Sequence, residues 1–420
     1  MCLNMCAEMR KVMLKGKNVL LCVTGSIAAY KIAELASRLV KKHCNVDVIM
    51  TKNATNFINP ITFETLTGNK CMVDTFDRNF QFNVEHVSLA KKADCVMVAP
   101  ASADVIGKMA NGIADDMLTT TVLACKCKIM VSPAMNTNMY DNRIVQDNIK
   151  KLCNYGFEVI EPDSGYLACG DTGRGKMPSP EVLEWHILRE IAKEKDLAGM
   201  NICVTAGPTR EIIDPVRYIS NNSTGKMGYA IAKEAMLRGA RVTLISGKVN
   251  LWPVPFVKMI DVISAKDMYD EVIKAAEYAD VIIKAAAVAD YRPACVSDNK
   301  IKKKDGDMSI ALSRTDDIIG TLGRNKKMGQ FLCGFSMETE NMLENSKAKL
   351  NKKNLDMIVA NNVKVAGAGF GTDTNVVTII TKNQCKELPI MSKEEVADEI
   401  LTCIKDMKTK ACFDDTSATS

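Results

Sequence analysis

The segment NVLLCVTGS, at residues 18–26, decides the predicted fold of the first half of the chain. Its first six residues form a short apolar run, which is typical of a buried strand, and Thr24-Gly25-Ser26 then interrupts that run. From residue 28 to residue 39, apolar side chains recur at the spacing of an amphipathic helix. The segment therefore predicts a strand, a glycine turn and a helix in direct succession.

The same succession recurs along the chain. Residues 201–206 (NICVTA) restart it in the second half, where Gly207-Pro208 ends the apolar run. Further strands are predicted at residues 46–50, 95–99, 128–131, 241–246 and 357–360, and within 280–289. Short, fully apolar strands separated by helices indicate parallel sheets covered on both faces. The chain is therefore predicted to be an α/β protein with two Rossmann-like domains.

Length and composition support two domains and exclude several classes of partner. A chain of 420 residues is too long for one ordinary core, so we expect a joint near residues 196–199. It has no stretch of 18 apolar residues, and residues 1–17 lack the apolar core of a signal peptide. The net charge is only +5, and no basic stripe is interleaved with aromatics. Sixteen cysteines without C-x-x-C pairs are typical of reduced thiols, so we expect a cytoplasmic protein that binds neither membranes nor nucleic acids.

Small and hydroxyl-bearing residues follow three predicted strands of the first half. Gly25 and Ser26 follow the first strand, Thr51 the second and Ser102 the third. The carboxyl ends of parallel strands line the ligand crevice of an open α/β sheet, and helix starts favour phosphate. Since the G-x-G-x-x-G fingerprint is absent, a mononucleotide or flavin is favoured over NAD.

Three further residues of the first half are candidates for chemistry. His86 is one of three histidines, Asn136 lies in PAMNTNMY at 133–140, and Cys169 lies in GYLACGDTGRGK at 165–176. A structural histidine, a turn-forming asparagine and an inert thiol are the alternative interpretations. The four glycines around Cys169 favour a flap over a packed core.

On these motifs, the first half resembles the flavin-containing cysteine decarboxylases, specifically the phosphopantothenoylcysteine decarboxylases. The resemblance rests on His86, on P-A-M-N-x-x-M-Y and on A-C-G-D-x-G-x-G-K, and it implies a flavodoxin-like, flavin-binding decarboxylase domain at residues 17–190. It implies that Asn136 holds the departing carboxylate, that His86 assists the first proton steps and that Cys169 donates a proton in the final reduction. The implied cofactor is FMN, held by Gly25, Ser26, Thr51 and Ser102.

The second half carries polar residues in comparable positions. Arg217 and Asn221 lie in DPVRYISNNSTGKMG at 214–228, which leads into a predicted helix without Walker A spacing. Asp290 follows a run of small residues, and Lys300 begins a lysine-rich run. On a later helix, residues 349 and 353 are lysines four apart, so one face presents two cations. Surface loops and a solvated helix face are the alternatives, but a nearby anion would relieve the repulsion.

This half resembles the phosphopantothenate–cysteine ligases across residues 198–405. The segments D-P-V-R-Y-I-S-N, A-A-A-V-A-D-Y, K-I-K-K and G-F-G-x-D-x-N carry the match, which implies a doubly wound ligase domain. It implies CTP, a divalent metal such as Mg²⁺ at Asp290, and an acyl-cytidylate on which Arg217 and Asn221 act while Lys300 stabilises charge. The implied CTP contacts are Lys284, Ala285, Ala286, Asp290, Lys300, Thr315, Asp316, Asp317, Ile318, Phe335, Lys349 and Lys353.

Three positions depart from the ligase pattern. Lys284 stands where a small or apolar residue is usual, Thr224 replaces a serine, and Ser336-Met337 replaces a pair of small residues. These departures bear on nucleotide contacts and not on the class of reaction.

Taken together, the two resemblances imply a bifunctional enzyme of coenzyme A biosynthesis and a homo-oligomer. It would join 4′-phosphopantothenate to cysteine with CTP and then decarboxylate the product to 4′-phosphopantetheine with FMN. The alternative is a flavodoxin-like redox protein fused to a dehydrogenase-like domain, and the absence of G-x-G-x-x-G in both halves argues against it. A related decarboxylase acting on a peptide's terminal cysteine is disfavoured by the ligase-like half.

Overall fold

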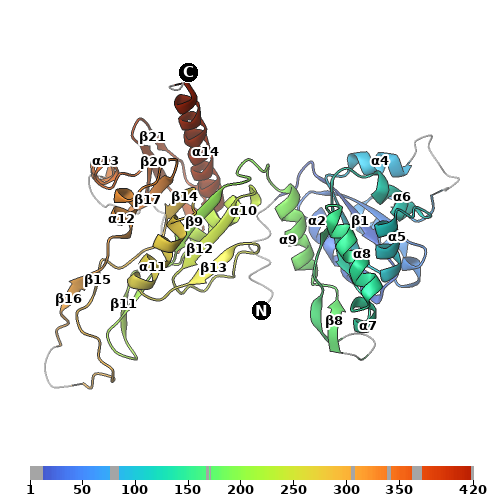
Figure 1. Ribbon diagram of the computed structural model, residues 1–420, viewed down its shortest axis with the longest axis horizontal. Coiled ribbons are helices and arrows are strands. Elements are labelled where there is room, and N and C mark those ends of the chain that lie inside the picture. Colours follow the sequence, from blue (N-terminus) through green and yellow to red (C-terminus); the bar gives the residue numbers. More distant parts are fainter. Residues whose placement is uncertain are drawn as a thin grey trace. The chain divides into compact units, whose positions relative to one another are not determined.

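The computed structural model describes residues 13–75, 85–166, 170, 172–303, 308–337, 342–361 and 371–417. The chain divides into two compact units, Met1–Lys193 and Glu194–Ser420, each with its own parallel sheet (Figure 1). The predicted α/β class is confirmed in both units. Within the described residues, no helix is long and apolar enough to cross a bilayer.

The first unit is built on a six-stranded parallel sheet with the order β3-β2-β1-β4-β5-β6. Its strands are β1 (Asn18–Val23), β2 (Asn45–Met50), β3 (Cys71–Met72), β4 (Cys95–Ala101), β5 (Lys128–Pro133) and β6 (Glu158–Val159). Since β1 pairs with both β2 and β4, the strand order reverses beside β1. That reversal is the switch point at which open α/β sheets bind ligands.

Helices and one hairpin complete the first unit. The helices are η1 (Ile27–Ala29), α2 (Tyr30–Val40), η2 (Ala54–Asn56), α3 (Pro60–Thr67), α4 (Glu85–Lys92), α5 (Ala103–Asn111), α6 (Met117–Ala124), α7 (Thr137–Tyr140), α8 (Arg143–Asn154) and α9 (Pro180–Ile191). Their ends follow capping rules: Asp116 closes a capping box on α6, and Gly112 ends α5 in the left-handed conformation. An antiparallel hairpin of β7 (Asp163–Tyr166) and β8 (Thr172–Lys176) forms from the glycine-rich segment.

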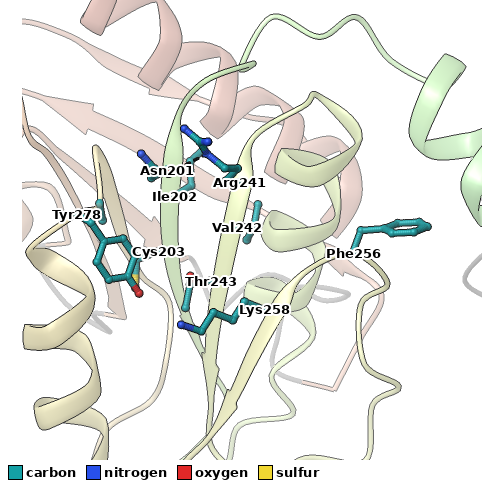
Figure 2. Close-up of a pocket in the computed structure, with 10 residues that line it drawn as sticks. Asn201, Ile202, Cys203, Arg241, Val242, Thr243, Phe256, Lys258 and Tyr278 are labelled. Atoms are coloured by element: carbon teal, nitrogen blue, oxygen red, sulfur yellow. Dashed lines mark hydrogen bonds between the residues drawn. The ribbon is translucent and has the colours of Figure 1, made fainter. Parts of the chain in front are cut away.

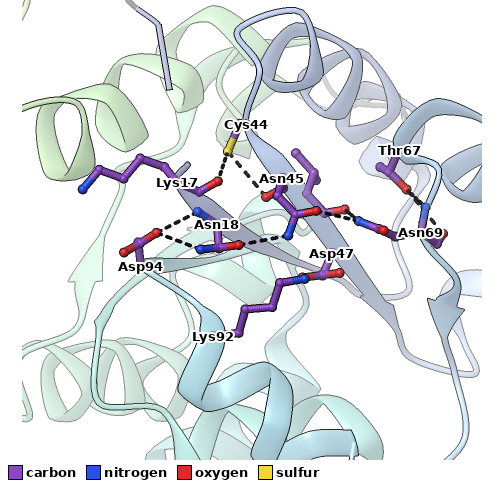
Figure 3. A network of polar contacts seen from close by, with 10 residues as sticks. Lys17, Asn18, Cys44, Asn45, Asp47, Thr67, Asn69, Lys92 and Asp94 are labelled. Atoms are coloured by element: carbon purple, nitrogen blue, oxygen red, sulfur yellow. Dashed lines mark hydrogen bonds and ion pairs between the residues drawn. The ribbon is translucent and has the colours of Figure 1, made fainter. Parts of the chain in front are cut away.

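A ladder of side chains ties the amino ends of the central strands together (Figure 3). Asp94 accepts hydrogen bonds from the backbone and the side-chain amide of Asn18, at 2.7 and 3.3 Å. Asn45 donates to the Asn18 amide oxygen, and Asn69 in turn donates to Asn45, at 3.0 and 3.1 Å. Parallel strands have no tight turn to set their register, so these amides help to align β1 with its neighbours.

The second unit has an eight-stranded sheet with the order β13-β12-β9-β14-β17-β18-β20-β21. Its strands are β9 (Asn201–Ala206), β12 (Arg241–Ser246), β13 (Lys258–Asp261), β14 (Val281–Lys284), β17 (Phe331–Met337), β18 (Met357–Asn361), β20 (Val377–Thr381) and β21 (Cys385–Glu387). The first six in the spatial order are parallel, whereas β20 and β21 add an antiparallel edge. The switch point lies at β9, between β12 and β14.

Helices and small ribbons complete the second unit as far as the structure describes it. The helices are α10 (Lys226–Leu237), α11 (Ala265–Ala276), α12 (Ile318–Arg324), α13 (Met342–Lys352) and α14 (Lys393–Ser417). The antiparallel ribbons pair β10 (Arg210–Ile212) with β11 (Tyr218–Ser220), β15 (Tyr291–Pro293) with β16 (Leu312–Arg314), and β19 (Thr374–Asn375) with β22 (Met391–Ser392). The first two ribbons follow the carboxyl ends of β9 and β14, where the candidate site lies.

A nearly buried arginine joins the start of the second unit to its last helix. Arg238, at the end of α10, donates to both carboxylate oxygens of Asp196 at 2.9 and 2.7 Å. It also donates to the Asp398 carboxylate and the Thr402 hydroxyl of α14, at 3.2 and 3.0 Å. The hydrogen bond from Arg238 lowers the pKa of Asp196, and Lys405 adds to this effect. The network therefore fixes the segment before β9 against α14.

Replacing Arg238 with Met should destabilise the second unit by about 2–4 kcal/mol, because Asp196 and Asp398 lose a cation that is largely removed from water. Urea unfolding followed by circular dichroism measures the effect. Asp196 has a lowered folded-state pKa, so its contribution is present at neutral pH and is lost as the pH falls through that pKa. The difference in unfolding free energy between the wild type and Arg238→Met should therefore become smaller at acidic pH.

The control is Lys266→Met, which removes an exposed ion pair with Asp270 on α11. Such pairs contribute less than about 1 kcal/mol, so this variant should unfold near the wild-type midpoint. Equal unfolding free energies for Arg238→Met and the wild type would contradict the structural role of the arginine.

Candidate active sites

The carboxyl ends of β1 and β4 are joined by one threonine hydroxyl. Thr24 is fully buried; its hydroxyl donates to the Pro100 carbonyl at 2.6 Å and accepts from the Ser102 backbone N–H at 2.9 Å. On the other side of β1, the Thr51 N–H donates to the Val23 carbonyl at 3.0 Å. The ends of the three central strands are therefore held side by side at the switch point of the first unit.

The predicted flavin residues lie at these strand ends. A Cβ on Gly25 would lie 2.8 Å from the Cβ of Asn53, so the turn after β1 requires glycine. The Ser26 hydroxyl caps η1 by accepting from Ala28, and the Ser102 hydroxyl caps α5 by accepting from Val105, at 3.3 and 3.4 Å. A glycine turn beside two capped helix starts suits a phosphate-bearing ligand such as a flavin mononucleotide.

The glycine-rich hairpin packs against the segment that contains Asn136. Gly175, with a φ of +129°, accepts the Met135 N–H at 3.1 Å, and a Cβ there would overlap the Met135 carbonyl oxygen. Asn136 caps α7, since its side-chain oxygen accepts from the Asn138 N–H at 2.8 Å. Cys169 falls between β7 and β8 in sequence and lies outside the described residues.

His86 lies in the first turn of α4 and is partly exposed. The preceding residues, 76–84, lie outside the described part of the chain. The role of His86, like those of Asn136 and Cys169, therefore stays a prediction.

The second unit has a cavity of about 500 Å³ at the carboxyl ends of β14 and β17. Its walls are the turn before α10, the small residues after β14, the end of β17 and the face of α13. The predicted site residues that line it are Asn221, Lys284, Ala285, Ala286, Asp290, Phe335 and Lys349. These side chains are as much as 128 positions apart, yet the fold gathers them around one space.

Hydrogen bonds hold the loop after β14 in an extended path along the cavity. The Thr205 and Thr209 hydroxyls accept the N–H groups of Ala286 and Ala289, at 3.1 and 3.0 Å. From the opposite wall, the Asn221 amide donates to the carbonyls of Ala287 and Val288, both at 3.1 Å. Because the loop side chains are small, a base or ribose can approach the backbone closely.

Cations gather at one end of this cavity. Lys284 ends β14, and burial lowers the pKa of its ammonium to about 8, with Lys349 and Lys353 lowering it further while Asp290 and Asp317 oppose the shift. Lys353 pairs with Asp317, whose other oxygen caps α12 by accepting from Gly320 at 2.9 Å. The remaining positive charge favours a polyanionic ligand.

The other predicted ligase residues do not line the cavity. Thr315 is tied to the cavity loop, since its hydroxyl donates to the Ala289 carbonyl at 2.7 Å. The Ile318 side chain is buried in the core, so it offers a ligand only its backbone, and Asp316 is exposed. Arg217 donates to the carbonyl of Ile301 at 2.8 Å, which places it next to the exposed Lys300.

The structure adds cavity residues that the sequence motifs did not single out. Asn361, Asn375 and Lys393 line the same space, and the Asn361 side-chain oxygen is buried with no hydrogen-bond partner among the described residues. Asn361 ends β18, so the rule that strand ends bind ligands would have found it. Lys393 starts α14, and nothing in its local sequence signals a role. Of the departures, Ser336 is buried and bonds Ser346 at 2.8 Å.

Two other cavities hold none of the predicted residues. One of about 270 Å³ lies at the amino ends of β9, β12 and β13, and Figure 2 shows Thr243, Lys258 and Tyr278 around it. The other, of about 840 Å³, includes Cys125 and Cys127 in the first unit. Both lie near the amino ends of strands, whereas α/β sheets carry their ligands at the carboxyl ends.

Comparisons with known proteins cover both units. Residues 8–191 match the flavoprotein family, and residues 197–407 match the C-terminal domain of DNA/pantothenate metabolism flavoproteins. The coenzyme A biosynthesis bifunctional protein CoaBC of Bacillus subtilis (strain 168) is 50% identical over 393 residues, which cover 93% of this chain and 97% of its own length. The protein of the same name from Escherichia coli (strain K12) is 41% identical over 396 residues, 93% of this chain and 98% of its own.

One solved structure, the C-terminal domain of a coenzyme A biosynthesis bifunctional protein CoaBC, is similar to the second half. It is 45% identical, with a TM-score of 0.45, and the match covers 52% of this chain and all of that domain.

The affinity of the second unit for a nucleoside triphosphate should fall by up to about tenfold between pH 7.5 and 9. Lys284 is a cation below its pKa of about 8, a bound phosphate favours that cation, and the attraction is lost as the pH rises through 8. Isothermal titration calorimetry measures the affinity. The Lys284→Met variant should bind more weakly at pH 7.5 and lose most of the pH dependence, whereas the exposed Lys274→Met control should keep it. An unchanged pH profile in Lys284→Met would contradict this role.

Proposed function

The chain belongs to the family of coenzyme A biosynthesis bifunctional proteins, and on this basis we propose how its two units divide the chemistry. It is an enzyme with ligase and carboxy-lyase activities. We assign the decarboxylase to residues 17–190 and the ligase to residues 198–405. The ligase acts first, because its product carries the carboxylate that the decarboxylase removes. A homo-oligomer, as the sequence resemblance implies, is part of this proposal.

The cavity of the second unit is the observation that supports the ligase most directly. In the proposed reaction, the carboxylate of 4′-phosphopantothenate attacks the α-phosphate of CTP, and pyrophosphate leaves. The cysteine amine then attacks the acyl carbonyl and displaces CMP. Both steps need reactants held in line and negative charge neutralised, which are the main contributions of nucleotidyl-transfer sites.

The residues of the cavity suit these two tasks. Lys284 and Lys349 would neutralise the triphosphate and the departing pyrophosphate, while the small residues after β14 accept the base and ribose. Asn221, already bonded to the loop carbonyls, would orient the acyl-cytidylate together with Arg217. Lys300 would stabilise the charge that develops during activation.

The donor set around Asp290 fits Mg²⁺ held mainly by the nucleotide. No group of three His, Cys, Asp or Glu side chains that could bind a metal exists within the described ranges. Mg²⁺ is commonly bound by one or two carboxylates plus substrate phosphates, so a single carboxylate at the cavity is sufficient. Asp290 would supply that carboxylate, and the bound ion would neutralise phosphate charge.

The strand ends of the first unit fit FMN. The turn at Gly25, where a Cβ would collide with Asn53, lets a phosphate approach the backbone, and Thr51 and Ser102 lie at the neighbouring strand ends. When bound, FMN supplies the removal and return of a hydride, which is the electronic part of the reaction. The chain's own residues orient the substrate carboxylate through Asn136 and move protons through His86 and Cys169.

A direct assay tests the whole assignment. The purified chain is incubated with 4′-phosphopantothenate, cysteine, CTP and Mg²⁺, and the products are identified by mass spectrometry. CMP, pyrophosphate, carbon dioxide and 4′-phosphopantetheine are expected, with ATP in a parallel reaction to measure the nucleotide preference. Flavin-loaded protein that releases no CMP would refute the ligase assignment.

The Cys169→Ser variant should block the second activity while it leaves the first intact. A serine hydroxyl is a much weaker acid than a thiol, so the proposed final proton transfer should fail and 4′-phosphopantetheine should fall at least a hundredfold. CMP release should stay within twofold of the wild type. The control is Cys153→Ser, an exposed cysteine on α8, which should form product normally. Wild-type 4′-phosphopantetheine formation by Cys169→Ser would disprove the assigned role.

A further inference from the structure

The loop that carries Lys300 is fixed at both sides of that lysine to the β10–β11 hairpin. Before it, the Ser297 N–H donates to the Ile213 carbonyl at 3.0 Å. After it, the Ile301 N–H donates to the Asp214 carboxylate at 3.2 Å, and Arg217 donates to the Ile301 carbonyl at 2.8 Å. Lys300 is itself exposed, so its position depends on these neighbours.

Asp214 is the centre of this arrangement. It is only 1% exposed, and its two carboxylate oxygens have separate partners. Oδ1 accepts the N–H groups of Val216 and Arg217, at 2.8 and 2.9 Å, and so closes the hairpin turn. Oδ2 accepts the Ile301 N–H and lies 3.7 Å from the Arg217 guanidinium. One oxygen therefore builds the turn, and the other holds the Lys300 loop.

The same hairpin reaches the cavity wall. Asn221 directly follows β11, and its amide donates to the Ala287 and Val288 carbonyls that line the cavity. The Ser220 hydroxyl, at the end of β11, donates to the Thr209 carbonyl at 2.7 Å. A continuous set of hydrogen bonds thus runs from the Lys300 loop through Asp214 and the hairpin to the cavity.

We infer that Asp214 is a positioning residue for the activation step, because it holds the Lys300 loop at a fixed distance from the loop that lines the cavity. This inference rests on the proposed function, in which Lys300 stabilises charge as CTP is attacked. It assigns the Asp214 carboxylate no contact with substrate. The effect of Arg217 would likewise be in part positional, since its guanidinium bridges Asp214 and Ile301.

An Asp214→Asn substitution distinguishes the two roles of the carboxylate, which are to close the hairpin turn and to hold the Lys300 loop. The amide oxygen can still accept from Val216 and Arg217, so the turn is kept. The amide nitrogen then faces the Ile301 N–H, donor against donor, and the anion beside Arg217 is gone. The variant therefore releases the Lys300 loop with the smallest possible change in shape.

The two half-reactions are measured separately in the full-length enzyme. Activation is followed as pyrophosphate release without cysteine, and the second step as CMP release when purified acyl-cytidylate and cysteine are supplied. Asp214→Asn should slow activation at least tenfold and slow the second step, on which Arg217 acts, to a smaller extent. If Asp214 acts by positioning Lys300, it has little effect once Lys300 is gone. The double variant should therefore activate CTP less than twofold more slowly than Lys300→Ala alone.

Glu211→Gln is the matched control. Glu211 is also a buried carboxylate of the hairpin, but it accepts the N–H of Ala265 at the start of α11, at 2.8 Å. Its variant should activate CTP at the wild-type rate. If Asp214→Asn does not fold by circular dichroism, Ile301→Pro removes the same hydrogen bond from the other side and should show the same activation defect.

The outcomes distinguish the positioning role of Asp214 from the catalytic role proposed for Lys300. A Lys300→Ala variant that activates at the wild-type rate overturns both the role proposed for Lys300 and the inference. A slow Lys300→Ala together with wild-type activation in Asp214→Asn, or in Ile301→Pro where the first variant does not fold, overturns the inference alone. It is likewise overturned if both half-reactions slow equally, or if the defects of Asp214→Asn and Lys300→Ala multiply.

Discussion

Both units depend on the same constraint, the fixing of one central strand between two parallel neighbours that no tight turn connects to it. β1 is held at its amino end by Asp94 and at its carboxyl end by the Thr24 hydroxyl. β9 is held in the same manner, since Asp280 accepts from the Asn201 backbone and amide at 2.7 and 3.0 Å. At the other end, Thr205 accepts the Ala286 N–H. The strand ends therefore meet in register, and the loops that leave them start from defined positions.

The two candidate sites at these strand ends differ in their charge. The first unit presents glycine, hydroxyl groups and helix starts, which suit a phosphate through neutral donors. The second gathers Lys284 and Lys349 around a cavity with few acids, so its affinity for polyanions is mainly a matter of net charge. Lys284 strengthens this contrast, because a small residue at the end of β14 would leave the cavity with one cation fewer.

The sequence predicts those parts of the molecule that depend on interactions between residues close together in the chain. The strand, turn and helix at residues 18–39, and the polar residues after each strand, follow from hydrophobic period and from the geometry of parallel sheets. The antiparallel edge of β20 and β21 depends on pairing with β18 and was not predicted. The places of Lys393 at the cavity and of Asp214 beside the Lys300 loop were missed for the same reason, because the fold brings together residues that are distant in sequence. The sequence named Arg217 and Lys300 as candidates with separate roles, and only the fold shows that Ile301 connects them.

The amide ladder at the amino ends of the strands also bears on how such a protein can change over evolutionary time. Asn18 with Asp94, and Asn201 with Asp280, keep each sheet aligned from the edge opposite the candidate sites. Loops at the other edge can accept insertions or substitutions without loosening the register of the strands. Two domains of related architecture can in this way carry unrelated chemistries, since selection on turnover and selection on foldability act on opposite ends of the strands.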